Sequence, residues 1–236
     1  MSKLTEIRAE IKGSADPKRA KALMRFFKTG VGQYGEGDKF LGITLPTTRA
    51  IVKKYKDLSL PDTQKFLKSK WHEERMIALL ILLEKFQKAD SKLQKTIFEI
   101  YLNNTKYINN WDLVDVTCRD IVGAYLDKKD RKILYKLATS KSLWERRISI
   151  ISTFYYIAQS DFNDTLKISK ILLSDKHDLI HKAVGWVLRE VGKKDITLLK
   201  KFLKENYENI PRTALRYSIE RFPDLERKKY LKGEID

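Results

Sequence analysis

The sequence predicts an all-α protein. Its apolar residues recur at spacings of three and four, the period of one face of an α-helix. The pattern is clearest at Ile77, Leu80 and Ile81, at Val114, Cys118, Ile121 and Tyr125, and at Val184, Leu188 and Val191. Convincing alternating runs bounded by turn signals, as a half-buried strand requires, are missing. The five prolines stand where helices are expected to start or stop, at Pro17, Pro46, Pro61, Pro211 and Pro223.

The chain also repeats itself. Several predicted helices carry a basic residue followed by small or apolar residues, and one carries a carboxylate at the same register. These positions are Arg49, Arg75, Asp115, Arg147, Lys182 and Arg212. Their spacings of 26, 40, 32, 35 and 30 residues suit pairs of helices in HEAT-like repeats. We therefore expect an α-solenoid in which one helix of each pair lines a concave face and the recurring residues point the same way.

Glycine gathers in one stretch near the N-terminus. Of the 10 glycines, five lie within residues 29–42. We expect a flexible connection there, between a first helical pair and the rest of a single domain spanning residues 1–236. The run from Gly30 to Gly35 matches GxGxxG, but a dinucleotide-binding fingerprint needs a preceding strand, and a helical segment precedes this one.

Composition narrows the class of partner. The chain has 236 residues and a formal net charge of +17, with a pI near 9.7. A polyanionic partner explains this excess, with nucleic acid ahead of an acidic membrane surface; the alternative is that the charge serves only solubility. The single cysteine, Cys118, excludes internal disulfides and a Cys-rich zinc site. No signal peptide or membrane-spanning run is visible, so we expect a cytoplasmic protein of the bacterial cytosol or nucleoid.

Asp115 is the one position in the repeat register where the sign of the charge reverses. Trp111 lies four residues earlier and so occupies the same helix face, one turn away. We expect Asn110 to cap this helix and Asp112 to lie in its first turn, where the helix dipole favours an anion. The helix dipole therefore accounts for a carboxylate at Asp112, but no such local effect accounts for the one at Asp115. A plain ion pair between Asp115 and Arg119 remains the alternative.

Arg147 is the second residue that stands out. It interrupts an otherwise apolar stripe formed by Leu143, Ile150 and Phe154. Its guanidinium is therefore expected to face other protein groups or a groove, and a structural ion pair is the alternative. Arg146 shares a polar face and is expected to be solvated.

Trp186 lies on a helix stripe with Lys182, Arg189 and Lys193. An indole among cations makes poor core but suits a surface that holds phosphates and stacks on a sugar or base. The alternative is a Trp covered by lysine stems.

The two histidines at His177 and His181 have the i,i+4 spacing of a degraded zinc motif. No third ligand is evident, and a catalytic zinc requires three from the protein. We interpret them as ordinary helical histidines and expect no metal site. Cys118 lacks a visible His partner, so a catalytic thiol is not expected.

Taken together, four segments resemble the AlkD-type DNA alkylation repair glycosylases, in the same order along nearly the whole chain. They are Phe40-Leu41-Gly42-Ile43, Asn110-Trp111-Asp112-Leu113-Val114-Asp115, Trp144-Glu145-Arg146-Arg147 and Lys182-Ala183-Val184-Gly185-Trp186-Val187-Leu188-Arg189-Glu190. The most specific are Trp-Asp-x-x-Asp and Gly-Trp-Val-Leu-Arg-Glu. The chain departs from the family at Phe26, where relatives often carry Tyr, and in residues 30–39, a segment longer than in some relatives.

The resemblance implies a HEAT-like α-solenoid whose concave groove binds duplex DNA. It implies excision of cationic N3- and N7-alkylated purines without a metal or organic cofactor, acting on a lesion left largely stacked. The family's catalytic carboxylate falls on Asp115, its sugar-contacting indoles on Trp111 and Trp186, and its active-site arginine on Arg147.

The function predicted from the sequence is thus a monofunctional alkylpurine DNA glycosylase, expected to act as a monomer on duplex DNA. The cations expected to bind the DNA backbone are Arg75, Lys182, Arg189, Lys193 and Arg212. Two alternatives stay open: a non-catalytic HEAT-like module that binds DNA structure, and a scaffold for protein interactions.

Overall fold

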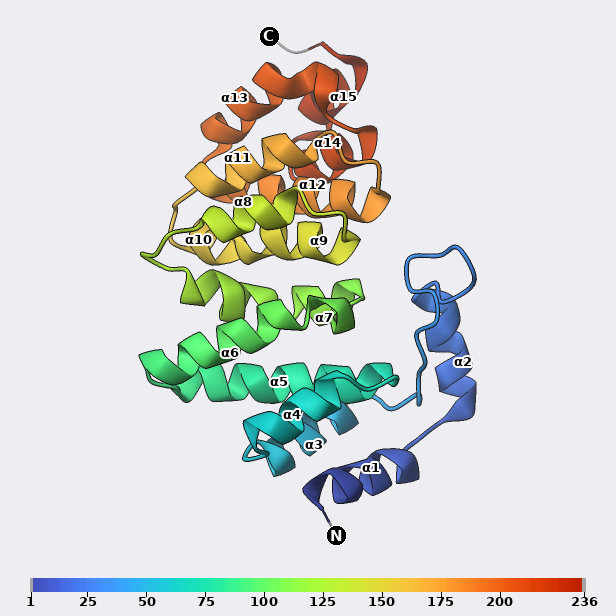
Figure 1. Ribbon diagram of the computed structural model, residues 1–236. Helices are drawn as coiled ribbons and strands as arrows, with labels where there is room; N and C mark the ends of the chain where they lie inside the picture. Colours follow the sequence, from blue (N-terminus) through green and yellow to red (C-terminus); the bar gives the residue numbers. More distant parts are fainter. Residues whose placement is uncertain (1, 235–236) are drawn as a thin grey trace. The chain divides into compact units, whose positions relative to one another are not determined.

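The computed structural model describes residues 2–234, which are helical with no strand among them. This confirms the predicted all-α class, and the packing of successive helices is consistent with an α-solenoid of helical repeats. The chain divides into two compact units, residues 1–117 and 118–236, and Figure 1 gives the order of the helices in each. The single domain and the concave groove stay predictions.

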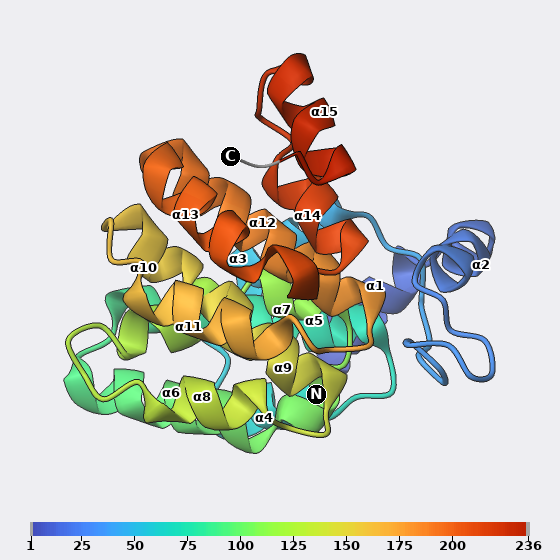
Figure 2. The same ribbon diagram turned by 90° about the horizontal axis from the view of Figure 1, so that it is seen from above.

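The N-terminal unit is organised around one long helix, α5, which packs against α3, α4, α6 and α7. Most of α5 is buried. Its middle is apolar on nearly every side, and the polar residues of its first turn are hydrogen-bonded or ion-paired within the unit. The helices of this unit are α1 (Lys3–Gly13), α2 (Pro17–Phe26), α3 (Leu45–Tyr55), α4 (Leu60–Leu67), α5 (His72–Lys88), α6 (Ser91–Asn103) and α7 (Trp111–Asp115), with a 3₁₀ turn at Thr105–Tyr107. In Figures 1 and 2, α2 lies to one side of α3–α5.

The C-terminal unit is organised around α12, which contacts α9, α11, α13 and α14. Figure 2 shows α12 between α13 and α14. The elements are a π-helix (Arg119–Gly123), α8 (Lys132–Ala138), α9 (Leu143–Ser152), α10 (Phe154–Ala158), α11 (Asn163–Leu172), α12 (Asp178–Lys194), α13 (Ile196–Asn206), a 3₁₀ turn (Tyr207–Asn209), α14 (Arg212–Ser218) and α15 (Asp224–Lys232). Gly185 permits the close approach of α12 to α14, since a Cβ there would lie 2.5 Å from the carbonyl oxygen of Ala214.

The prolines mark helix starts, as predicted. Three of them occupy the first turn of α2, α3 and α4, and two immediately precede α14 and α15. A proline is tolerated there because the N–H groups of a first turn have no partner within the helix. Side chains of Asp16, Thr44 and Ser59 accept hydrogen bonds that cap the helices after them.

The glycine-rich segment is more firmly held than a flexible connection would be. Asp38 and Phe40 are 6% and 5% exposed, and a Cβ on Gly35 would lie 2.4 Å from the carbonyl oxygen of Phe27. Gly42 has a φ of +85° and abuts the backbone of Asp16. The second half of the segment is therefore packed against the N-terminal unit, which corrects the expectation of flexibility.

The residues of the predicted register lie near the starts of their helices. Arg49, Arg75, Asp115, Arg147 and Lys182 all lie within the first five residues of their helix, and Arg212 begins α14. Their surroundings nevertheless differ, because Arg75 and Arg147 are buried whereas Arg49 and Arg212 are exposed. Within residues 2–234, no helix is both long and apolar enough to cross a bilayer.

Candidate functional site

The short helix α7 presents an indole and a carboxylate from one turn. Leu113 and Val114 are fully buried and fix the helix to the unit, whereas Trp111 and Asp115 are partly exposed. Asn110 precedes the helix, and its side-chain oxygen accepts a hydrogen bond from the Trp111 N–H at 2.9 Å. The predicted cap at Asn110 and the first-turn position of Asp112 are both confirmed.

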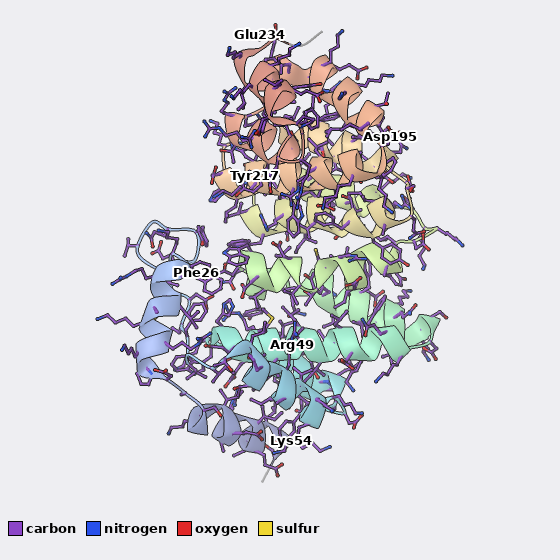
Figure 3. The ribbon with its side chains drawn as sticks, turned by 180° about the vertical axis from the view of Figure 1, so that it is seen from behind. Phe26, Arg49, Lys54, Asp195, Tyr217 and Glu234 are labelled. Carbon is purple, nitrogen blue, oxygen red and sulfur yellow. The ribbon has the colours of Figure 1, made fainter. Side chains whose placement is uncertain are left out.

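Trp111 belongs to an aromatic cluster. The ring of Phe27 lies 5.2 Å from the Trp111 ring, and the ring of Phe26 meets it edge-on at 5.9 Å. Phe26 is 62% exposed at the end of α2, where Figure 3 labels it. Phe26 therefore supplies an aromatic edge beside the indole, without a hydroxyl.

Asp112 has a partner that the sequence does not reveal. Its Oδ2 lies 2.8 Å from Nε2 of His72, and Nδ1 of the same ring lies 2.8 Å from Oδ2 of Asp38. The helix dipole alone therefore does not account for Asp112. No spacing rule could have found this cluster, because the carboxylates lie 34 and 40 residues from His72 in the sequence.

Arg75 joins this cluster instead of facing solvent. It is 3% exposed, its Nη2 lies 2.7 Å from Oδ1 of Asp38, and its Nη1 donates to the carbonyl oxygen of Ser69 at 3.1 Å. Both amino groups are thereby engaged, so Arg75 is not available to a DNA phosphate. The sequence placed Arg75 on a DNA-binding face because periodicity shows which helix face a residue occupies but not what covers that face.

Arg147 is buried in the C-terminal unit at 5% exposure. Its Nη1 donates to the carbonyl oxygen of Leu179 at 2.6 Å, so it faces protein groups, one of the two predicted possibilities. Arg146 is not solvated as expected, because its Nε lies 2.5 Å from Oδ2 of Asp175 and its side chain is 18% exposed.

Trp186 is partly exposed, and its ring lies 4.6 Å from that of Phe154. The cations on its stripe contact carboxylates. Lys182 pairs with Asp178 at 2.8 Å and Lys193 with Glu190 at 2.7 Å. Arg189 is held by Glu220 and Glu190. Arg212 is exposed at the start of α14. Binding of DNA by these four cations stays a prediction.

The N-terminal unit contains a cationic pocket of about 530 Å³ that the sequence pattern does not predict. Its cations come from α1, α4 and the segment before α5, and are Arg8, Lys12, Lys65, Lys68 and Lys70. Trp71 also lines it, with Lys70 5.4 Å from the indole ring. Glu74 pairs with Arg8 and Asp62 with Lys65, while Lys68 and Lys70 are exposed. We name this set the cationic pocket.

His177 and His181 make hydrogen bonds at the N-terminal end of α12. His177 caps the helix, accepting from the Leu179 N–H at 3.1 Å, and Nε2 of His181 lies 2.5 Å from the carbonyl oxygen of Asp175. Across residues 2–234 no cluster of three metal-ligating side chains is present.

Comparison with known proteins identifies the family. The sequence profile described as DNA alkylation repair enzyme matches residues 7–222. A solved structure, a predicted DNA alkylation repair enzyme from Enterococcus faecalis, is 16% identical with a TM-score of 0.69, over 89% of this chain and 98% of that one. That likeness shows the fold. No curated protein matches. Because the profile spans most of the sequence, the chain belongs to the DNA alkylation repair enzyme family.

Proposed function

We propose that this protein is a DNA glycosylase that hydrolyses the N-glycosidic bond of N3- and N7-alkylated purines in duplex DNA. The observation that carries the proposal is the partly exposed pair of Trp111 and Asp115 on α7, in a chain of the DNA alkylation repair enzyme family with a net charge of +17.

The chemistry suits a single carboxylate. Cleavage of an N-glycosidic bond builds positive charge on the sugar, as in glycoside hydrolysis. A fixed carboxylate beside C1′ stabilises this charge and orients the attacking water, and Asp115 fills this role in the proposal. An alkylated purine is already cationic and leaves without a general acid. One carboxylate therefore suffices where sugar hydrolases need two.

The indole of Trp111 supports the same sugar. Its face attracts a developing cation, and Phe26 and Phe27 fix the orientation of the ring. From the C-terminal unit we propose Trp186 as a second sugar contact. We propose that Arg147, which is buried and bonded to the Leu179 carbonyl oxygen, acts on the DNA indirectly, by holding the start of α12 in place.

Replacing Trp186 with Ala is expected to slow excision about tenfold or more while weakening binding to undamaged DNA by less. A cation–π contact to a desolvated cation contributes about 2 kcal/mol, and undamaged DNA develops no such cation. The measurement is the single-turnover rate of base release beside the Kd for undamaged duplex. Ile196→Ala, which removes an exposed apolar side chain from α13, is the matched control. Equal losses in rate and binding would make Trp186 a general DNA anchor.

The cationic pocket is expected to contribute to DNA affinity through charge. Each phosphate contact adds about 0.9 to the slope of log K against log salt concentration. Lys68→Gln combined with Lys70→Gln should therefore reduce the slope by about 1.8, measured by fluorescence anisotropy at several salt concentrations. Lys92→Gln with Lys95→Gln removes two other exposed cations, from α6, and should leave the slope unchanged. A similar fall in both double variants would mean that only net charge matters.

The proposed function is tested by incubating the protein with duplex DNA containing N-methylpurines and detecting the free base. Release of 7-methylguanine or 3-methyladenine above the spontaneous rate is the expected result. Salt-sensitive binding without release would favour a DNA-binding module, and salt-insensitive binding would favour a protein-interaction scaffold.

A further inference from the structure

His72 occupies an unusual position in the N-terminal unit. Its side chain is 4% exposed, and each ring nitrogen lies 2.8 Å from a carboxylate oxygen, one of Asp38 and the other of Asp112. An ionised carboxylate only accepts hydrogen bonds, so both ring nitrogens must donate. With both carboxylates ionised, the geometry fits the doubly protonated, positively charged imidazolium.

The cluster balances its own charge. Arg75 contacts the second oxygen of Asp38, so two cations face two carboxylates. The other acids near His72 on α5 are engaged elsewhere, Glu73 with the Leu41 and Gly42 N–H groups and Glu74 with Arg8. Burial lowers the pKa of His72, but the hydrogen bonds and charges of Asp112 and Asp38 outweigh it and raise this pKa to about 9.

His72 is the only described anchor of the Asp112 carboxylate. Oδ2 of Asp112 receives its hydrogen bond from His72, and the buried Oδ1 has no hydrogen-bond partner among residues 2–234. Asp112 stands beside Trp111 and three residues before Asp115 on a helix of five residues. So short a helix does not hold its own geometry.

A second line of contacts joins the same ring to Trp111. The His72 ring stacks on Phe40, with centroids 4.3 Å apart, and lies 5.2 Å from Phe27, which in turn packs on the Trp111 ring. His72 thus contacts Asp112, the residue next to Trp111 in the chain, and also Phe27, which packs on the Trp111 ring.

We propose that His72 is a positioning residue for base excision: its imidazolium fixes Asp112, neutralises that carboxylate where DNA must approach, and thereby holds Trp111 and Asp115 in their reactive orientation. The proposal rests on the proposed glycosylase function. If His72 positions these residues, the excision rate depends on the charged form of His72. If His72 serves folding alone, the excision rate of the folded protein does not depend on that charge.

The test compares wild type, His72→Gln and Asp112→Asn in single-turnover release of 7-methylguanine between pH 6 and 9.5, with a protein-free blank at each pH. Misplacement of a functional group by about 1 Å can cost up to about a hundredfold in rate. We expect that loss in rate at pH 7 for both variants, with the Kd for undamaged duplex within about threefold of wild type.

The pH profile separates positioning from folding. The wild-type rate should fall as the pH rises through about 9, where His72 loses its proton. This alkaline fall should be absent from His72→Gln, which has no charge to lose. It should move to lower pH in Asp112→Asn, because one of the two carboxylates that stabilise the imidazolium is gone. If His72→Gln fails to fold, the excision rate and pH profile of Asp112→Asn still test the proposal.

Asp164→Asn is the matched control. Like Asp112, Asp164 is a mostly buried carboxylate in the first turn of its helix, but it pairs with Arg131 and Tyr135 outside the cluster, so its loss should lower stability without changing the excision rate. A wild-type rate in folded His72→Gln or Asp112→Asn, or the same alkaline fall in His72→Gln, would overturn the positioning role while leaving the glycosylase function intact. Absence of base release by the wild type overturns both.

Discussion

Asp115→Asn is expected to slow the release of 7-methylguanine from methylated duplex DNA about a thousandfold while leaving DNA binding in place. Two unit charges about 4 Å apart at an effective dielectric near 20 attract each other by roughly 4 kcal/mol. The sugar carries its full charge only near the transition state, so this energy is lost from the rate and not from binding. Single-turnover release of free base and the Kd for the same duplex are the two measurements.

Asp120→Asn is the control for the change in net charge. Asp120 is a partly exposed carboxylate five residues further along the chain, paired with Arg119, and its loss raises the net charge by the same amount. We expect near-wild-type excision from it. Unchanged release by Asp115→Asn would remove Asp115 from the catalytic role, and a loss of both release and binding would make it a structural residue.

The free energy of unfolding is expected to fall by about 3 kcal/mol as the pH rises from about 6.5 to about 9. The pKa of His72 is raised from 6.5 in the unfolded chain to about 9 in the folded protein. A raised pKa means that the folded state binds the proton more tightly. Its stabilisation is therefore complete below pH 6.5 and is lost as the pH rises through the folded value, at about 1.4 kcal/mol per pH unit.

Urea unfolding followed by tryptophan fluorescence at several pH values measures this slope, with His72→Gln as the comparison. The variant should be less stable at pH 6.5 and should show a flatter dependence on pH up to 9.

The carboxyl group of Asp38 contributes to the pH dependence of stability in the acid range. Burial raises its pKa, but His72 and Arg75 outweigh this and lower it, so its contribution is present above pH 3.8 and is lost towards lower pH. Parallel pH curves for wild type and His72→Gln would exclude a charged His72.

Local features of the fold could be predicted from the sequence because they depend on residues a few positions apart. Helix periodicity predicted the all-α class, and prolines predicted the starts of α2, α14 and α15. The cap at Asn110 followed from the same kind of rule, since a capping side chain acts on the turn beside it.

The burial of charged groups could not be predicted in this way. Periodicity placed Arg75 and Arg147 on a helix face, but packing of distant segments decided that both are buried. The expectation that Arg146 is solvated was wrong for the same reason, because its partner Asp175 lies in another part of the chain.

The sequence by itself determined the helices, the excess of positive charge, and the placement of Trp111 and Asp115 on one helix face. Only the tertiary structure decided that Asp38, His72, Arg75 and Asp112 form one buried charge cluster. The physical reason is that helix formation is set by contacts within about four residues, whereas the charge state of a buried group depends on what the fold brings within hydrogen-bond distance.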